Sequence, residues 1–217
     1  MQNYSILRET MVDTQVRPSD VTKFPIIDAM LSVPREAFLP DALRDVAYMG
    51  ENIEIAQGRC VLEPRTIAKM LDGLNVTADE LVLDVAPALG YSTALLAQLA
   101  EAVVAVEEDE DMASEAEANL GAHGIHNAAV ITGPLTEGSA KHGPYDVIVI
   151  QGGVSDVPQA LLDQLKEGGR IAAIFMSGAL GEVRIGHKIE GAVNWRMEFN
   201  AAAPVLPGFS PAPAFVF

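Results

Sequence analysis

The sequence predicts an α/β domain in which helices cover both faces of a mostly parallel central sheet. Two observations predict this fold class: β-rich apolar runs alternate with helical stretches between residues 81 and 175, and Gly, Pro or polar residues bound those helical stretches. Such alternation is typical of βαβ units. With 49% hydrophobic residues and a mean hydropathy of +0.21 over 217 residues, the chain can bury a sizeable core, which argues against intrinsic disorder.

The predicted strands of the parallel sheet follow the apolar runs and cover residues 81–85, 103–107, 129–132, 146–150 and 170–175. The helices predicted between them cover residues 92–99, 112–120 and 158–165. Gly168 and Gly169 favour a stop of the last helix before the next strand. Together these elements predict a Rossmann-like core over residues 76–180.

The N-terminal region, residues 1–75, differs from this core. It contains no long β-branched run, and apolar residues such as Ile26, Ile27, Met30 and Leu31 fall at helical spacing. The two prolines that bound residues 34–40 then interrupt the helix. We expect a helical N-terminal cap within the same single domain.

The C-terminal region, residues 181–217, predicts a pair of antiparallel strands at 183–189 and 195–199. This pair is expected to close one edge of the sheet, with Trp195, Met197 and Phe199 in the core. Prolines interrupt the tail beyond residue 203, so only its last few residues are expected to add to a strand.

Acidic residues dominate the charge of the chain: 30 Asp and Glu against 14 Lys and Arg give a formal net charge of −16 and a pI near 4.5. This charge repels phosphate backbones and anionic bilayers, so we expect neither nucleic acid nor a membrane as a partner. No apolar run reaches the roughly 18–20 residues of a membrane span, and the N-terminus lacks a signal-peptide pattern. We therefore expect a soluble protein of the cytoplasm.

Cys60 is the only cysteine, which excludes an internal disulfide and leaves no framework for a structural zinc site. We expect no metal site. A lone cysteine is most often a small buried apolar residue. That interpretation is favoured over a nucleophile, because the sequence pairs no base with Cys60.

A nucleoside pocket is expected where the first two strands of the sheet end, since ligands of open α/β sheets bind at the carboxyl ends of the strands. Asp84 lies at the end of the first strand, before a turn of small residues, 86–90, that leads into a helix. Glu107 ends the second strand, where an acid typically binds the ribose hydroxyls of a nucleotide-like cofactor. The acids at 108–117 fit an exposed helix whose first turn suits negative charge.

Several motifs extend this pattern along the chain. They are Met-Val-x-x-Gln at 11–15, Val-Pro-Arg-Glu-x-Phe-x-Pro at 33–40, Asp84 with Gly90-Tyr91, Glu107, Pro-Tyr-Asp at 144–146 and Pro-x-x-Leu-x-x-Gln-Leu-x-x-Gly-Gly at 158–169. In this order and spacing, the sequence resembles the protein-L-isoaspartate O-methyltransferase family, within the S-adenosylmethionine-dependent methyltransferases. The resemblance covers residues 11 to about 175 and implies a Rossmann-like methyltransferase fold.

The resemblance also implies S-adenosyl-L-methionine as cofactor and proteins or peptides with isoaspartyl residues as substrate. Enzymes of the family methylate the free α-carboxylate of such residues, and the ester then collapses to a succinimide that reopens partly as aspartate, which repairs damaged protein. A carboxylate is already a nucleophile at neutral pH, so catalysis is mostly positioning. We therefore assign no catalytic residue.

By their places in these motifs, two sets of site residues are implied. The cofactor set comprises Asp84, Ala86, Ala88, Gly90, Glu107, Pro134 and Leu135. The substrate set comprises Gly58, Cys60, Leu62 and Pro64.

Three stretches depart from the pattern of the family. Ala86 and Ala88 replace two glycines of a Gly-x-Gly-x-Gly turn, and Pro87 is expected to force Ala86 toward an extended conformation. Cys60 and Leu62 replace the Thr and Ser of a Gly-Gln-Thr-Ile-Ser-x-Pro loop, which removes hydrogen-bonding groups. Residues 133–135 read Gly-Pro-Leu instead of Gly-Asp-Gly and lack the acid that holds the adenine amino group in the family.

These departures leave alternatives open. The chain is an isoaspartyl methyltransferase, a family member that has lost methyl transfer and serves as a binding or regulatory module, or a methyltransferase for a different, cationic substrate. A nicotinamide-dependent dehydrogenase is disfavoured, because the Gly-x-Gly-x-x-Gly fingerprint is absent. Arg59 and Arg65, beside the altered loop, are expected either to pair with acids at the surface or to hold a substrate carboxylate. The sequence does not determine the oligomeric state.

Overall fold

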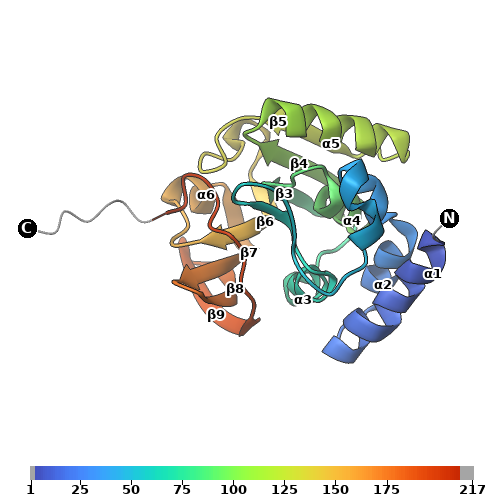
Figure 1. The fold of residues 1–217 in the computed structure, drawn as a ribbon. Helices are drawn as coiled ribbons and strands as arrows, with labels where there is room; N and C mark the ends of the chain where they lie inside the picture. Colours follow the sequence, from blue (N-terminus) through green and yellow to red (C-terminus); the bar gives the residue numbers. More distant parts are fainter. Residues whose placement is uncertain (1–2, 211–217) are drawn as a thin grey trace, which may run out of the picture.

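A seven-stranded sheet forms the centre of the computed structural model, which describes residues 3–210 (Figure 1). Its strand order is β5-β4-β3-β6-β7-β8-β9; the first five run parallel, and β8 and β9 run antiparallel at one edge. The predicted α/β class and the antiparallel C-terminal edge are thereby confirmed. The strands are β3 (Leu81–Val85), β4 (Ala102–Glu107), β5 (Ala128–Thr132), β6 (Tyr145–Val154), β7 (Leu165–Ser177), β8 (Leu180–Ile189) and β9 (Ala192–Asn200).

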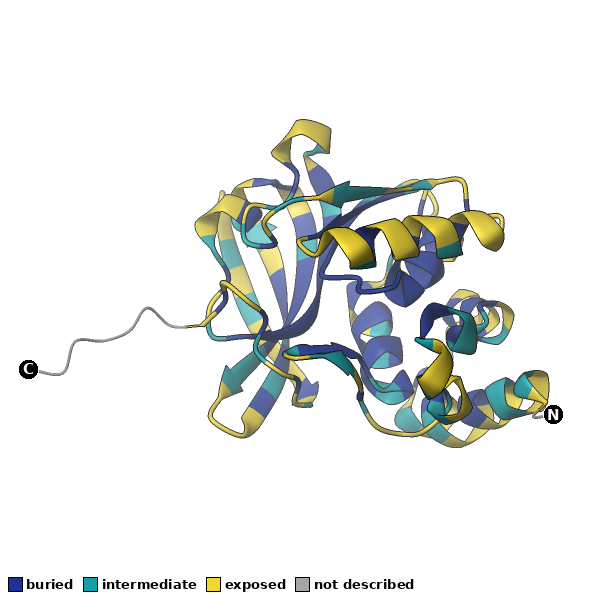
Figure 2. Cartoon of the chain, turned by 45° about the horizontal axis from the view of Figure 1, so that its top comes forward, coloured by how far each residue is buried: buried dark blue, intermediate teal, exposed yellow. Residues whose placement is uncertain are grey.

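Helices lie on both faces of this sheet, as predicted (Figure 1). Side chains alternate along each strand, so that on β3 Val82 belongs to one core layer while Leu83 and Val85 belong to the other. The central strands are buried along most of their length (Figure 2). The first layer contains α1 (Tyr4–Met11), α2 (Phe24–Ser32), α3 (Pro64–Leu74), α4 (Tyr91–Leu99) and α5 (Glu110–Ala122), and the second contains α6 (Gln159–Asp163).

The prediction of a helix at 158–165 is wrong at the C-terminal end. Helix α6 ends at Asp163, and β7 already begins at Leu165, which pairs with Tyr145 of β6. The backbone N–H of Tyr145 donates to the Gln164 carbonyl at 2.8 Å. This ladder contact with β6 is long-range, so helical spacing in the local sequence could not predict where the helix stops.

A separate two-stranded antiparallel sheet lies within the region predicted as a helical cap. It consists of β1 (Ile53–Ala56) and β2 (Arg59–Val61), joined by a turn in which Gly58 has a φ of +73°. The strands are four and three residues long, too short to leave a β pattern in the sequence. Their side chains Ile53, Cys60 and Val61 are buried, so tertiary packing holds this hairpin in place.

The C-terminal predictions are met in part. Phe199 is buried, and Trp195 packs edge-on against Phe175. The prediction that Met197 lies in the core is wrong, because this residue is 45% exposed on the outer strand. Val205 forms a single parallel bridge with Gly153. The last residues of the tail, 211–217, which were expected to add to a strand, lie outside the described residues. No helix within residues 3–210 is both long and apolar enough to cross a membrane.

Candidate functional site

Asp84, at the end of β3, is fully buried and accepts hydrogen bonds from three side chains. Ser92 Oγ and Thr93 Oγ1, at the start of α4, lie 2.6 and 2.8 Å from its Oδ2, and Gln151 Nε2 of β6 lies 2.8 Å from its Oδ1. Burial raises the pKa of Asp84 to about 6, although these hydrogen bonds oppose the rise. Asp84 thus joins β3 to α4 and β6. These partners were not predicted from the sequence, although the two hydroxyl residues next to Gly90-Tyr91, Ser92 and Thr93, were a signal for them.

The turn after β3 adopts left-handed backbone at three positions. Ala86 and Ala88 have φ of +64° and +56°, and Gly90 has φ of +97°. The expectation that Pro87 makes Ala86 extended is therefore wrong. The Ala86 N–H donates to the Val106 carbonyl at 2.9 Å, and this contact with β4 holds the turn against the preference of the local sequence. Each left-handed alanine costs roughly 1–2 kcal/mol, which the buried setting of the turn must offset.

Glu107, at the end of β4, lies against this turn and is completely buried. The Ala88 N–H donates to its Oε2 at 3.1 Å, so the structure joins the predicted turn to the predicted ribose acid. The backbone N–H groups of Glu108 and Asp109 donate to Oε1 at 2.9 and 3.3 Å. These three donors keep the carboxylate fixed at the carboxyl end of the sheet.

Arg59 of β2 forms a bidentate ion pair with the same carboxylate. Its Nη1 lies 2.6 Å from Oε1 of Glu107, and its Nη2 donates to Oε2. Arg59 is 5% exposed, so this pair is buried and is not the surface link that the sequence suggested. Together with the three backbone donors, Arg59 fills the roughly four acceptor positions that a carboxylate offers. The pairing was missed because the two residues are 48 positions apart.

The predicted substrate loop meets the turn after β3 at a small cavity. Cys60 and Leu62 line this cavity together with Ala86, Tyr91 and Gln151. Its volume is about 10 Å³, which is room for at most one water molecule. Burial raises the pKa of the Cys60 thiol to about 11, so the thiol stays protonated at neutral pH and matches the apolar interpretation of this residue.

The other two predicted substrate-loop residues, Gly58 and Pro64, do not line this cavity. Gly58 forms the turn between β1 and β2, and Pro64 begins α3. Arg35, from the Val-Pro-Arg-Glu motif, is fully buried and donates from Nη2 to the Leu62 carbonyl at 2.8 Å and from Nε to the Ala47 carbonyl at 2.7 Å. This arginine fixes the backbone of the loop. Its motif stood out in the sequence, but this role of Arg35 was not predicted.

The backbone of the stretch after β5, residues 133–135, is hydrogen-bonded to the backbone of Glu107. The Gly133 N–H donates to the Glu107 carbonyl at 2.9 Å. Pro134 is exposed, whereas Leu135 is 1% exposed and belongs to the second core layer. The geometry therefore leaves Pro134 at the edge of the site and directs Leu135 into the core.

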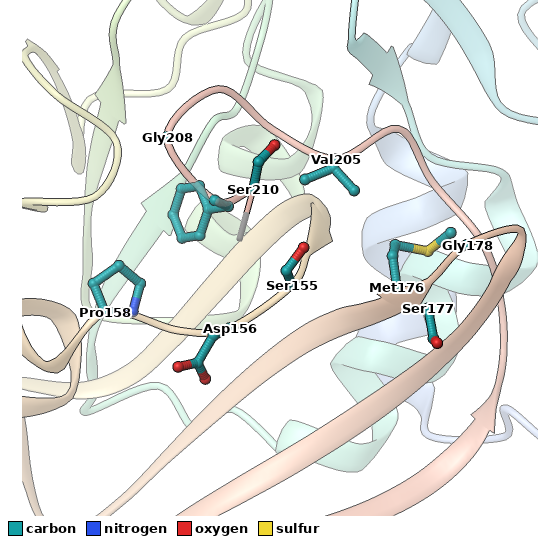
Figure 3. Close-up of a pocket in the computed structure, with 10 residues that line it drawn as sticks. Ser155, Asp156, Pro158, Met176, Ser177, Gly178, Val205, Gly208 and Ser210 are labelled. Carbon is teal, nitrogen blue, oxygen red and sulfur yellow. The ribbon is translucent and has the colours of Figure 1, made fainter. Parts of the chain in front are cut away.

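A larger, open pocket of about 880 Å³ lies beyond the carboxyl ends of β6 and β7 (Figure 3). Ser155 and Asp156, just after β6, line one side, and Met176 and Ser177, at the end of β7, line the other. Because Gln151 of β6 lines the small cavity, both cavities lie toward the same end of this strand. None of the predicted site residues lines the large pocket. Within residues 3–210, no three His, Cys, Asp or Glu side chains are arranged to hold a metal ion.

Comparison with known proteins decides the family. The family model described as protein-L-isoaspartate(D-aspartate) O-methyltransferase matches residues 8–181. The chain belongs to this family. A protein-L-isoaspartate O-methyltransferase of Methanoculleus marisnigri is 37% identical over 166 residues, covering 76% of each chain. Another, of Koribacter versatilis, is 32% identical over 215 residues, covering 98% of this chain and 97% of its relative.

Solved structures of the protein-L-isoaspartate O-methyltransferase family share the fold. One matches with a TM-score of 0.80 at 23% identity, covering 93% of this chain and 66% of that structure. A putative member from Plasmodium falciparum, solved in complex with S-adenosyl-L-homocysteine, matches with a TM-score of 0.79 at 19% identity, covering 95% and 99%. The fold class predicted from the sequence motifs is thereby confirmed.

Proposed function

We propose that this chain is an S-adenosylmethionine-dependent methyltransferase that esterifies the free carboxylate of isoaspartyl residues in proteins or peptides. The observation that carries the proposal is the family match over residues 8–181, which spans the cofactor core and the substrate loop. Relatives over 30% identical that bear the name of this activity support it.

The residues at the ends of β3 and β4 fit the cofactor in type. Glu107 has two carboxylate oxygens at the place where an acid binds ribose hydroxyls in such folds. The Ala88 N–H contacts this carboxylate, which brings the turn at 86–90 beside the same position. The fit requires Arg59 to leave Glu107, because their bidentate pair takes both oxygens.

The cofactor, when bound, supplies an electrophilic methyl group on a sulfonium sulfur. The carboxylate of an isoaspartyl residue is ionised at neutral pH, so the chain needs no general base, and its residues act by binding and orienting. Cys60 keeps its proton because burial raises its pKa to about 11, and it therefore does not compete with the substrate as a nucleophile. Gln151, held by Asp84, lines the small cavity, and the open pocket beyond β6 offers space for the rest of a peptide.

A methylation assay tests this function. The full chain is incubated with methyl-labelled S-adenosylmethionine and an isoaspartyl peptide, and base-labile label in the peptide is measured. The same peptide with ordinary aspartate is the matched control. Label in the isoaspartyl peptide alone is the expected result. No label in either peptide, at cofactor concentrations that saturate the protein, would contradict the proposal.

One observation favours a second candidate function, a binding module that has lost methyl transfer. The space between the substrate loop and the turn at 86–90 is closed to about 10 Å³, with Leu62 in place of the family's Ser. A folded chain that binds S-adenosylhomocysteine and methylates neither isoaspartyl peptides nor other acceptors would support this candidate. Label in another acceptor would indicate a methyltransferase with a different substrate.

A further inference from the structure

The Arg59–Glu107 ion pair occupies the position that the proposed cofactor requires. A guanidinium donates two parallel N–H groups to the two oxygens of a carboxylate. The vicinal hydroxyls of a ribose would donate to the same two oxygens. Because the three backbone donors at Ala88, Glu108 and Asp109 take further acceptor positions, the carboxylate cannot accept from Arg59 and from a ribose together.

Arg59 lies on an element that packs against the rest of the chain but is not a strand of the central sheet. The β1–β2 hairpin is a sheet of its own and has no strand pairing with the seven-stranded sheet among residues 3–210. Isolated two-stranded hairpins are marginally stable by themselves. Next to the hairpin, Asn52 Nδ2 donates to the Ala202 carbonyl at 2.8 Å, and Arg35 Nη2 holds the Leu62 carbonyl. The Arg59–Glu107 pair is the ionic link from the hairpin to the cofactor end of the sheet.

Glu107 remains supported when Arg59 leaves. Its three backbone donors belong to the turn at 86–90 and to the residues just after β4, and none belongs to the hairpin. An exposed acid, Glu108, follows Glu107 directly in the chain and could take the released guanidinium at the surface. The carboxylate can therefore exchange one bidentate partner for another at a fixed position.

We propose that Arg59 is a latch on the cofactor site: it holds Glu107 in the free chain, and a nucleoside binds only when Arg59 and the β1–β2 hairpin release that carboxylate. This inference rests on the proposed function, since it takes Glu107 as the ribose acid. Arg59 then sets the affinity for the cofactor without touching the reacting atoms. The family loop has Gln where this chain has Arg59, so Arg59→Gln removes the charged latch while keeping a family residue.

Calorimetric titration with S-adenosylhomocysteine tests the latch. Arg59→Gln should bind about tenfold more tightly or better, because a competing contact worth only about 1.4 kcal/mol already changes a dissociation constant tenfold. Arg59→Lys keeps the charge but not the planar fork, so its affinity for S-adenosylhomocysteine should fall between those of Arg59→Gln and the unaltered chain. Arg170→Gln is the matched control, since Arg170 forms a bidentate pair with Glu80 beside the amino end of β3. The affinity of this variant for S-adenosylhomocysteine should equal that of the unaltered chain.

Hydrogen exchange gives a readout that needs no ligand. Without nucleoside, the amides of β1 and β2 should exchange faster in folded Arg59→Gln than in the unaltered chain. If Arg59→Gln and the unaltered chain bind S-adenosylhomocysteine equally well, or if their β1 and β2 amides exchange at equal rates, the latch is overturned while the proposed function stands. No binding by any folded variant overturns both the latch and the proposed function.

Discussion

Replacing Asp84 with asparagine should change how the stability of the protein depends on pH. Burial raises the pKa of Asp84 from the ordinary value of 3.8 to about 6. The folded chain thus holds this proton more tightly than the unfolded chain does. The stabilisation from the protonated group is fully present below the ordinary pKa, and it is lost as the pH rises through the folded pKa.

The magnitude follows from the two pKa values. Their difference corresponds to about 3 kcal/mol between strongly acidic and neutral pH. About 1 kcal/mol of this is lost between pH 5 and pH 7, a window that lies above the isoelectric point of 4.5. The introduced amide cannot ionise, and its oxygen can still accept from Ser92 and Thr93 while Gln151 turns its own amide. Over this window, the unfolding free energy of Asp84→Asn should therefore rise by about 1 kcal/mol relative to the unaltered chain.

Urea unfolding at several pH values measures this difference. Asp146→Asn is a control: burial opposes ionisation of Asp146, but hydrogen bonds from Lys166 and the Leu81 N–H outweigh it and lower its pKa. The contribution of Asp146 to the free energy of unfolding is lost only as the pH falls below the ordinary pKa of an aspartate. The difference in unfolding free energy between Asp146→Asn and the unaltered chain should therefore stay constant between pH 5 and pH 7. A constant difference for Asp84→Asn as well would refute the reasoning from burial.

Three further substitutions test the buried ion pair, the turn after β3 and the end of helix α5. Glu107→Gln leaves the Arg59 guanidinium buried without a counter-charge, so urea unfolding should show a loss of about 3–5 kcal/mol, and adding Arg59→Gln should restore part of it; an unchanged midpoint would contradict a buried pair. Gly90→Ala should lower the stability by at least about 1–2 kcal/mol, because φ is +97° and the added Cβ would lie 3.4 Å from that of Ala116. Gly121→Ala, in α5 with open space around it, should raise the melting temperature through a gain of up to about 1 kcal/mol, and a loss there would show that the helix end is under strain.

Apolar runs in the sequence predicted the buried strands of the central sheet. The apolar runs at 81–85 and 103–107 correspond to β3 and β4 within one residue, since a strand buried on both faces needs apolar side chains throughout. The strand-end position of Asp84 and Glu107 also followed from the sequence, because parallel strands bring their carboxyl ends to one edge of a sheet.

The conformation of the turn shows where local reasoning fails. Pro87 disfavours left-handed backbone at Ala86 only as a local preference. The hydrogen bond from Ala86 to Val106 and the burial of both alanines act against it. The same holds for β1 and β2, whose few residues carry too weak a β pattern to compete with the helical spacing around them.

Spacing and residue type along the chain were enough to predict the family, the parallel sheet and the two acids at its edge, because these features are encoded locally. The distant partners of those acids emerged only from the folded chain. Asp84 meets Gln151 across 67 positions, and Glu107 meets Arg59 across 48. Such pairs depend on how separate elements pack against one another, and no pattern within one element specifies which distant side chain will reach a buried carboxylate.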